Sequence, residues 1–380
     1  MNDKPSRREF LQRTAATAGA MVIAPIAKSL DLHSSESKQA ASVEPLQEAA
    51  TRKGLLYGGA VEQIHLQREA DFAHLFGRQC GILVPEGALK WGSLRPSPDR
   101  FDFEGADYLL NFALQNQMKM RGHALLAHDT VPSWFASYAN PRNAKELLVN
   151  HITTVAGRYR DKMHSWDVVN EAILPGDHRS DGLRNSEWLR LLGPEHIEIA
   201  FHAAAQADPS ALLVWNENWM EEENTDGDNR RAAFLRHLKD LRSRSVPIHA
   251  VGLQSHLIGK HKDIIAGAGF QRFLQEVVEM GLKILVTELD VRDYDFPQDF
   301  QTRDSMVADV YHKYLTAVLQ HKSVLAVLTW GLSDRHTWVS RFTTPRADGI
   351  AMRPLPFDPE LNPTAVYTSM MSAFDQAPHR

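Results

Sequence analysis

The sequence is poor in cysteine, since Cys80 is the only one among 380 residues. A single cysteine cannot close an internal disulfide, and it cannot build a zinc site from several thiolates. Cys80 also lies in a largely apolar stretch, residues 79–84, where a small hydrophobic residue suits a core. We therefore interpret Cys80 as a core residue rather than a nucleophile.

The chain also lacks a concentration of positive charge and a long apolar run. Its formal net charge is −5, and its basic residues form no stripe. Nucleic acids and anionic membrane surfaces attract proteins through clustered lysine and arginine. The apolar stretch Ala15–Ala27 is shorter than the roughly 20 residues that cross a bilayer. We therefore expect no nucleic-acid partner and no stable membrane insertion.

Several common catalytic motifs are missing from the chain. There is no Gly-x-Gly-x-x-Gly turn, no Gly-Lys-Ser/Thr loop, no Gly-x-Ser-x-Gly elbow and no His-Glu-x-x-His helix. These absences disfavour dinucleotide binding, phosphate-loop chemistry, serine hydrolysis and zinc proteolysis. His123 and His128 are five residues apart, so a regular strand would place them on opposite faces. We expect no cofactor and no catalytic metal.

The N-terminus has the pattern of an export signal. Residues 6–11, Ser-Arg-Arg-Glu-Phe-Leu, resemble the twin-arginine signal, and the apolar stretch Ala15–Ala27 follows. We predict a signal segment at 1–30, a disordered linker rich in Ser, Glu and Gln at 31–50, and one catalytic domain at 51–380. The protein would then work in the periplasm or outside the cell. A basic cytosolic N-terminus is the alternative.

After residue 50, strand-like and helix-like segments alternate eight times. The predicted strands are Leu56–Val61, Gly81–Pro85, Lys119–Ala127, His164–Asn170, Leu212–Asn216, Ala250–His256, Lys283–Leu289 and Val324–Gly331. Eight β–α units of this size predict the α/β class and a single (β/α)8 TIM barrel. A doubly wound open sheet is the alternative, but the chain lacks its glycine-rich turn.

Two of these strands end in carboxylates. Residues 166–172 read Trp-Asp-Val-Val-Asn-Glu-Ala, and residues 285–290 read Leu-Val-Thr-Glu-Leu-Asp. Glu171 and Glu288 would therefore meet at the catalytic face of the barrel, as a pair of the kind that hydrolyses glycosidic bonds. Residues two apart on a strand share a face, so His256 and Asp290 could hold Glu288 ionised.

The chain from about residue 55 to 374 resembles glycoside hydrolase family 10, the retaining endo-β-1,4-xylanases. The matching segments come in the family's order: Glu86-x-x-x-Lys90-Trp91, Gly122-His123, 166–172, Leu183-Arg184-x-Ser186-x-Trp188, Ala207-Asp208-Pro209, Gly252-x-Gln254-x-His256, 287–290 and Trp330-Gly331-x-x-Asp334-x-x-x-Trp338. The resemblance implies a retaining glycosidase that hydrolyses xylan or a related β-linked polysaccharide. We expect it to be a monomer.

The resemblance also implies roles for individual residues. Glu171 would be the general acid/base and Glu288 the nucleophile. The residues that bind the sugar or support this pair would be Lys90, His123, Asn170, Gln254, His256, Asp290, Trp330 and Trp338. Asn170 would contact the sugar 2-hydroxyl, and Trp330 and Trp338 would form the floor of the substrate-binding cleft.

Some positions depart from the family's pattern. Gly87 replaces an expected asparagine, Ala127 a tryptophan and Thr130 a glutamine, while residues 216–219 read Asn-Glu-Asn-Trp instead of Asn-Asp-Tyr-Asn. We expect Trp219 to fill the space that Ala127 leaves beside Lys90. These departures keep two alternatives open: a glycosidase with shifted specificity for a substituted xylan or another β-glycan, and a secreted glycan-binding protein that has lost catalysis.

Overall fold

The computed structural model describes residues 43–343 and 345–380. The predicted signal segment and the linker up to residue 42 lie outside these described residues. Among the described residues, no helix combines the length and the apolar character that crossing a bilayer requires.

Eight parallel strands close into a barrel. They are β1 (Leu56–Val61), β2 (Ile82–Pro85), β3 (Lys119–Gly122), β5 (Ser165–Asn170), β6 (Leu212–Glu217), β7 (Ala250–Leu253), β9 (Lys283–Arg292) and β10 (Val324–Thr329). Each pairs with the next along the chain, and β10 pairs with both β9 and β1, which closes the sheet. The predicted (β/α)8 barrel is confirmed.

Two short strands extend the barrel at its carboxyl end. Strand β4 (Leu126–Ala127) pairs with β5, and β8 (His256–Ile258) pairs with β9. The predicted strands 119–127 and 250–256 are thus each broken in two. Between β7 and β8 the cause is visible, because Ser255 adopts a left-handed backbone conformation (φ 61°) that no regular strand contains.

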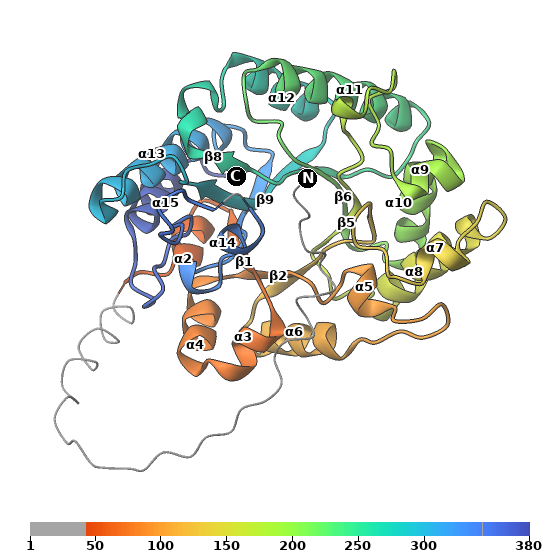
Figure 1. Cartoon of the computed structure of the whole chain (residues 1–380), viewed down its shortest axis with the longest axis horizontal. Helices are drawn as coiled ribbons and strands as arrows, with labels where there is room; N and C mark the ends of the chain where they lie inside the picture. Colours follow the sequence, from red (N-terminus) through yellow and green to blue (C-terminus); the bar gives the residue numbers. More distant parts are fainter. Residues whose placement is uncertain (1–42, 344) are drawn as a thin grey trace, which may run out of the picture. The chain divides into compact units, whose positions relative to one another are not determined.

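Helices surround the strands (Figure 1). They are α2 (Leu46–Thr51), α3 (Gln63–Arg68), α4 (Ala70–Gln79), α5 (Trp91–Leu94), α6 (Glu104–Gln115), α7 (Phe135–Tyr138), α8 (Ala144–Arg158), α9 (Glu187–Leu192), α10 (Glu195–Ala207), α11 (Thr225–Ser243), α12 (Ala268–Glu279), α13 (Phe300–Val318), α14 (Val339–Phe342) and α15 (Ala365–Gln376), with 3-10 turns η2 (Pro175–Asp177), η3 (Gly259–Ile264) and η4 (Asp334–His336). Two of the long helices begin with a side-chain cap. Asn224 accepts a hydrogen bond from the Gly227 amide at the start of α11, and Asp299 accepts one from the Thr302 amide at the start of α13.

Helix α2 corrects the predicted start of the domain. Leu46, Ala49 and Ala50 are completely buried, and their spacing puts them on one face of a helical turn. The prediction of a disordered linker was therefore wrong for residues 46–50. Composition misled it, because Gln47 and Glu48 occupy the other face of the same turn.

The core has two parts. Side chains of the strands fill the barrel interior, and a larger layer lies between the barrel and its helices. Cys80 belongs to the larger layer and is buried, as predicted. With the interior filled by side chains, the open ends of the strands are the face on which chemistry can occur.

Candidate active site

The predicted catalytic pair lies in one pocket at the carboxyl ends of the strands. The pocket has a volume of about 140 Å³. Its walls are Lys90, His123, Ala124, Ala127, Asp129, Thr130, Asn170, Glu171, His256, Glu288, Trp330 and Trp338. Eight of the ten predicted site residues therefore line the pocket. The other two, Gln254 and Asp290, lie behind it and contact residues of the wall.

Glu288 is almost fully buried, on β9. Its Oε1 accepts a hydrogen bond from Asn216 Nδ2 (2.7 Å), and its Oε2 lies 3.2 Å from His256 Nε2. Burial alone would raise the pKa of this carboxyl. The charge of His123, the hydrogen bond and charge of His256 and the bond from Asn216 outweigh burial and hold the pKa of Glu288 at about 2. The site therefore keeps Glu288 ionised.

His256 carries the balancing positive charge. Its Nδ1 lies 3.0 Å from Asp290 Oδ2, which also accepts from Trp338 Nε1 at 2.7 Å. Burial disfavours a charged imidazole, but Asp290 and Glu288 on either side raise the pKa of His256 to about 10. The row Asp290, His256 and Glu288 is the one predicted from the i,i+2 spacing.

Glu171 has a different environment. It directly follows β5 in a left-handed conformation (φ 58°), and its side chain is 21% exposed. Gln254 Nε2 donates to its Oε1 at 3.0 Å, and Arg184 lies 3.4 Å from its Oε2. Arg184 also donates to the Glu171 carbonyl at 2.6 Å, so it holds both the backbone and the side chain. The Glu288 carboxyl is thus buried beside positively charged groups, whereas the Glu171 carboxyl is partly exposed at the rim of the pocket.

The Glu217 carboxylate holds the backbone that follows Glu171. Its Oε1 accepts from the amides of Ala172 (2.7 Å) and Ile173 (3.1 Å) and from Trp215 Nε1 (2.7 Å), which fixes the turn after Glu171. Its Oε2 is buried without a partner among the described residues. Complete burial, with the nearby charge of Glu171, raises the pKa of Glu217 to about 8 despite these bonds.

Several of these supporting residues were missed from the sequence. Arg184 stood in a matched segment, Asn216 ends a predicted strand and Glu217 directly follows it, but none was assigned a role. His128, which was likewise given no role, has its Nδ1 3.7 Å from Glu171 Oε2. The signal for Asn216 and Glu217 was their place at a strand end beside β5.

The space beside Gly87 is occupied by a side chain. A Cβ atom on Gly87 would lie 2.6 Å from Glu62 Oε1, so the Glu62 carboxyl occupies the volume that an asparagine would use. The prediction that Trp219 fills the space beside Ala127 is wrong. Trp219 does not line the pocket and instead stacks on Arg292, with 5.1 Å between Cζ and the ring centroid.

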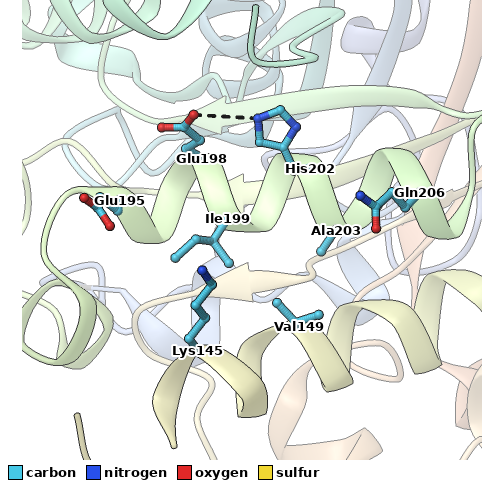
Figure 2. Close-up of a pocket in the computed structure, with 8 residues that line it drawn as sticks. All are labelled: Lys145, Val149, Glu195, Glu198, Ile199, His202, Ala203 and Gln206. Atoms are coloured by element: carbon cyan, nitrogen blue, oxygen red, sulfur yellow. Dashed lines mark ion pairs between the residues drawn. The ribbon is translucent and has the colours of Figure 1, made fainter. Parts of the chain in front are cut away.

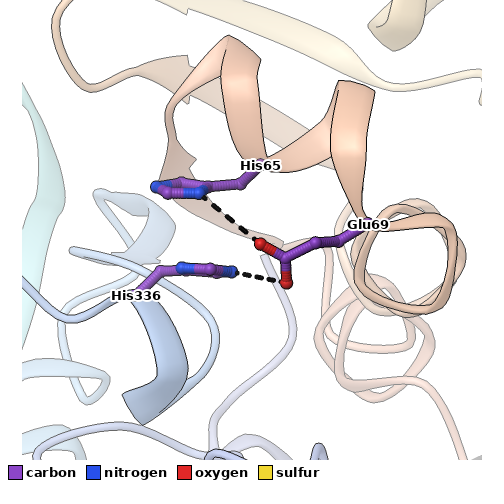
Figure 3. A group of neighbouring side chains, drawn as sticks. All are labelled: His65, Glu69 and His336. Atoms are coloured by element: carbon purple, nitrogen blue, oxygen red, sulfur yellow. Dashed lines mark hydrogen bonds and ion pairs between the residues drawn. The ribbon is translucent and has the colours of Figure 1, made fainter. Parts of the chain in front are cut away.

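Two groups of side chains have the composition of metal ligands. His123, Asp167 and Glu288 lie together, but Arg121 donates to both oxygens of Asp167 and supplies the local positive charge. His65, Glu69 and His336 form the second group (Figure 3). Both of these groups of described residues hold together through their own charges and hydrogen bonds.

The second group joins α3 to η4. Its two imidazole rings stack with centroids 3.7 Å apart, and Arg335 and His336 both contact Glu69 Oε2, at 3.2 and 3.0 Å. A guanidinium on that oxygen opposes a bound cation, so we interpret the group as a structural contact.

A larger hollow, of about 430 Å³, lies between α8 and α10 (Figure 2). Lys145 faces it from α8, and Glu195, Glu198, His202 and Gln206 face it from α10. His202 pairs with Glu198 at 3.7 Å. All of these groups belong to the outer helices, whereas the reactive pair stands at the strand ends.

Comparison with known proteins places these features in a family. The family model of glycosyl hydrolase family 10 matches residues 45–373. Endo-1,4-beta-xylanase 3 of Hypocrea jecorina is 35% identical over 323 residues, covering 84% of this chain and 83% of that protein. Endo-1,4-beta-xylanase B of Thermotoga neapolitana is 32% identical over 301 residues, covering 79% and 82%. The crystal structure of native xylanase 10B from Thermotoga maritima superposes with a TM-score of 0.78 at 29% identity, covering 87% of this chain and 98% of that one.

Proposed function

Because the chain belongs to glycosyl hydrolase family 10, we propose that it cleaves β-1,4 bonds within xylan and retains the configuration at the anomeric carbon. One observation carries the proposal: Glu171 and Glu288 line a single pocket in unlike surroundings. The buried cationic setting keeps Glu288 ionised, while Glu171 stands at the rim, where it can exchange protons with a leaving group and with water.

The two carboxyls divide the reaction between them. Glu288 attacks the anomeric carbon while Glu171 gives its proton to the leaving oxygen, so one C–O bond forms as the glycosidic bond breaks. Glu171 then removes a proton from water, whose oxygen displaces Glu288 and restores both groups. Asn170 lies beside Glu171 (3.5 Å), where a sugar hydroxyl of the bound unit would come.

The rest of the pocket suits a sugar. Trp330 and Trp338 offer apolar faces for a pyranose ring, and Lys90 Nζ lies 5.8 Å from the Trp330 ring centroid. The Thr130 hydroxyl is buried without a partner among the described residues, which leaves it available to a sugar hydroxyl. A non-catalytic glycan-binding role gains no support, since both glutamates and their partners are in place.

Retention is directly measurable. Xylooligosaccharide hydrolysis followed by proton NMR should show the β-anomer first, with the α-anomer appearing only by mutarotation. Product masses from plain xylan, arabinoxylan, glucuronoxylan and mixed-linkage glucan would identify the polymer. Initial release of the α-anomer would contradict the double displacement, and glucan as the best substrate would contradict xylan.

A shifted substrate specificity remains the second candidate function. The observation that favours it is the Glu62 carboxyl, which occupies the volume that the family's asparagine would use at position 87. Gly87→Asn alone should lower kcat/KM on every xylooligosaccharide, because its Cβ would collide with the Glu62 carboxyl. Combining it with Glu62→Ala should restore activity and shift preference toward the plain chain by about twofold to tenfold, the value of one added hydrogen bond. Glu62→Ala is the matched control. An unchanged ratio of plain to substituted substrate in the double variant would exclude this position from specificity.

We also propose that residues 1–30 direct twin-arginine export, residues 31–45 link the signal to a monomeric catalytic domain, and the enzyme meets its polymer in the periplasm or outside the cell. The Ser-Arg-Arg-Glu-Phe-Leu segment supports this. Cell fractionation of an Arg7→Lys/Arg8→Lys chain is the test, and unchanged export would reject the signal.

A further inference from the structure

Strand β9 runs past the barrel and ends in an arginine beside the pocket. Glu288, Asp290 and Arg292 alternate along the strand, so they share one face. Strand β8 pairs with this extension, with Ile258 opposite Arg292. The pairing fixes the backbone of Arg292 at the rim, four residues beyond the Glu288 carboxylate.

The Arg292 guanidinium is held between two tryptophans. Its Cζ lies 5.1 Å from the ring centroid of Trp219 and 5.4 Å from that of Trp338. Trp338 is a wall of the pocket, while Trp219 follows β6 in a left-handed conformation (φ 58°). Contacts on two sides restrict the plane of the guanidinium, which lowers the entropy lost when it binds a ligand.

Arg292 lacks an ion-pair partner in the part of the chain that the structure describes. Among the described residues, no carboxylate forms an ion pair with Arg292, and its Nε is buried without a hydrogen bond. Arg346, by contrast, is a buried arginine whose charge is met by a carboxylate, since it pairs with Asp348 at 2.6 Å. A desolvated donor without an acceptor is costly to a protein. A bound anion would satisfy Arg292.

The pocket connects to this arginine through a row of rings. The ring centroids of Trp330 and His256 are 6.3 Å apart, and those of His256 and Trp338 are 4.8 Å apart. Trp338 in turn contacts the Arg292 guanidinium. Lys90 stands at the other end of the row, 5.8 Å from Trp330. Trp338 therefore borders both the reactive pocket and Arg292, which places this arginine within reach of a sugar chain that extends beyond the pocket.

We propose that Arg292, between Trp219 and Trp338, binds the carboxylate of a uronic-acid side group on the polysaccharide. A guanidinium offers two parallel N–H groups that match a carboxylate, and the neighbouring Trp219 face suits a sugar ring. The inference rests on the proposed function and narrows its substrate to an acidic, substituted xylan. It assigns Arg292 and Trp219 to substrate binding.

The test compares two substrates of equal backbone length, one plain and one carrying a glucuronic acid group. The wild-type enzyme should prefer the acidic substrate by about tenfold in kcat/KM at low salt, and the preference should shrink as salt screens the charges. Arg292→Gln should bring the ratio close to one, and Arg292→Lys should recover only part of it. Arg272→Gln, an exposed arginine on α12, makes the same charge change and should keep the wild-type ratio.

A binding measurement separates this inference from the proposed function. Calorimetry with the Glu288→Ala protein should show tighter binding of the acidic oligosaccharide, and adding Arg292→Gln should remove the difference. Equal binding of the two ligands would overturn the role of Arg292 even if xylan is hydrolysed. Preferential binding without any hydrolysis by the wild type would instead keep the Arg292 site and reject the proposed reaction.

Discussion

Replacing Glu288 by alanine should lower kcat/KM for an aryl β-xylobioside by at least about a thousandfold, since the loss of a nucleophile removes the covalent route altogether. The groups around Glu288, which are His256, His123 and Asn216, stabilise a negatively charged carboxylate. Alanine has no carboxylate to attack the sugar. Steady-state release of the aryl group measures the effect. Glu279→Ala, an exposed glutamate on α12, should retain wild-type activity.

Small anions can then distinguish the two glutamates. Azide entering the space vacated in Glu288→Ala should restore turnover and form the α-glycosyl azide, because it attacks from the face of the lost carboxylate. Glu171→Ala should still form the glycosyl-enzyme from a good leaving group, and azide should then yield the β-product. Wild-type rates in Glu288→Ala, with the fold intact by circular dichroism, would reject the assignment.

Strand ends were the predictable part of this site. Parallel strands bring their carboxyl ends to one face, so the sequence around Glu171 and Glu288 was sufficient to place both carboxyls together. The i,i+2 rule likewise anticipated the row formed by His256, Glu288 and Asp290. In these cases backbone periodicity alone determines which side chains meet.

Contacts made by long side chains between strands could not be predicted in this way. Glu62 directly follows strand β1 and covers Gly87, and the rotamer that achieves this has no periodic signature. Trp219 was correctly noticed as an unusual aromatic but assigned to the wrong side of the pocket. Its left-handed backbone directs the ring toward Arg292, and a single sequence does not reveal that conformation at a non-glycine residue.

The same limit applies to Glu217. Its position at the end of β6 was clear, but its function depends on three donors converging on one oxygen, two of them backbone amides of the turn after Glu171. Backbone donors are invisible in a sequence, because every residue except proline has one. The charge network around the pocket is therefore a property of the fold.

Removing the charge of His256 should show how this network sets the working pH. In His256→Gln, the charge of His123 and the bond from Asn216 still oppose the burial of Glu288, but the hydrogen bond and charge of His256 are lost, so the pKa of Glu288 should rise from about 2 toward its ordinary 4.5. The acid limb of the kcat/KM profile should move up by at least about one pH unit, so the activity lost relative to the wild type should grow as the pH falls. His379→Gln, an exposed histidine near the C-terminus, should leave the profile unchanged.

Stability should follow the same linkage. The pKa of His256 is raised from 6.5 to about 10, so its contribution is complete below pH 6.5 and is lost as the pH rises through 10. The pKa of Glu288 is depressed from 4.5 to about 2, so its contribution is present above pH 4.5 and is lost as the pH falls through 2. The difference in Tm between wild type and His256→Gln should therefore be largest between pH 4.5 and 6.5 and shrink on both sides. A difference that stays constant from about pH 2 to about pH 10 would mean that His256 acts through packing rather than charge.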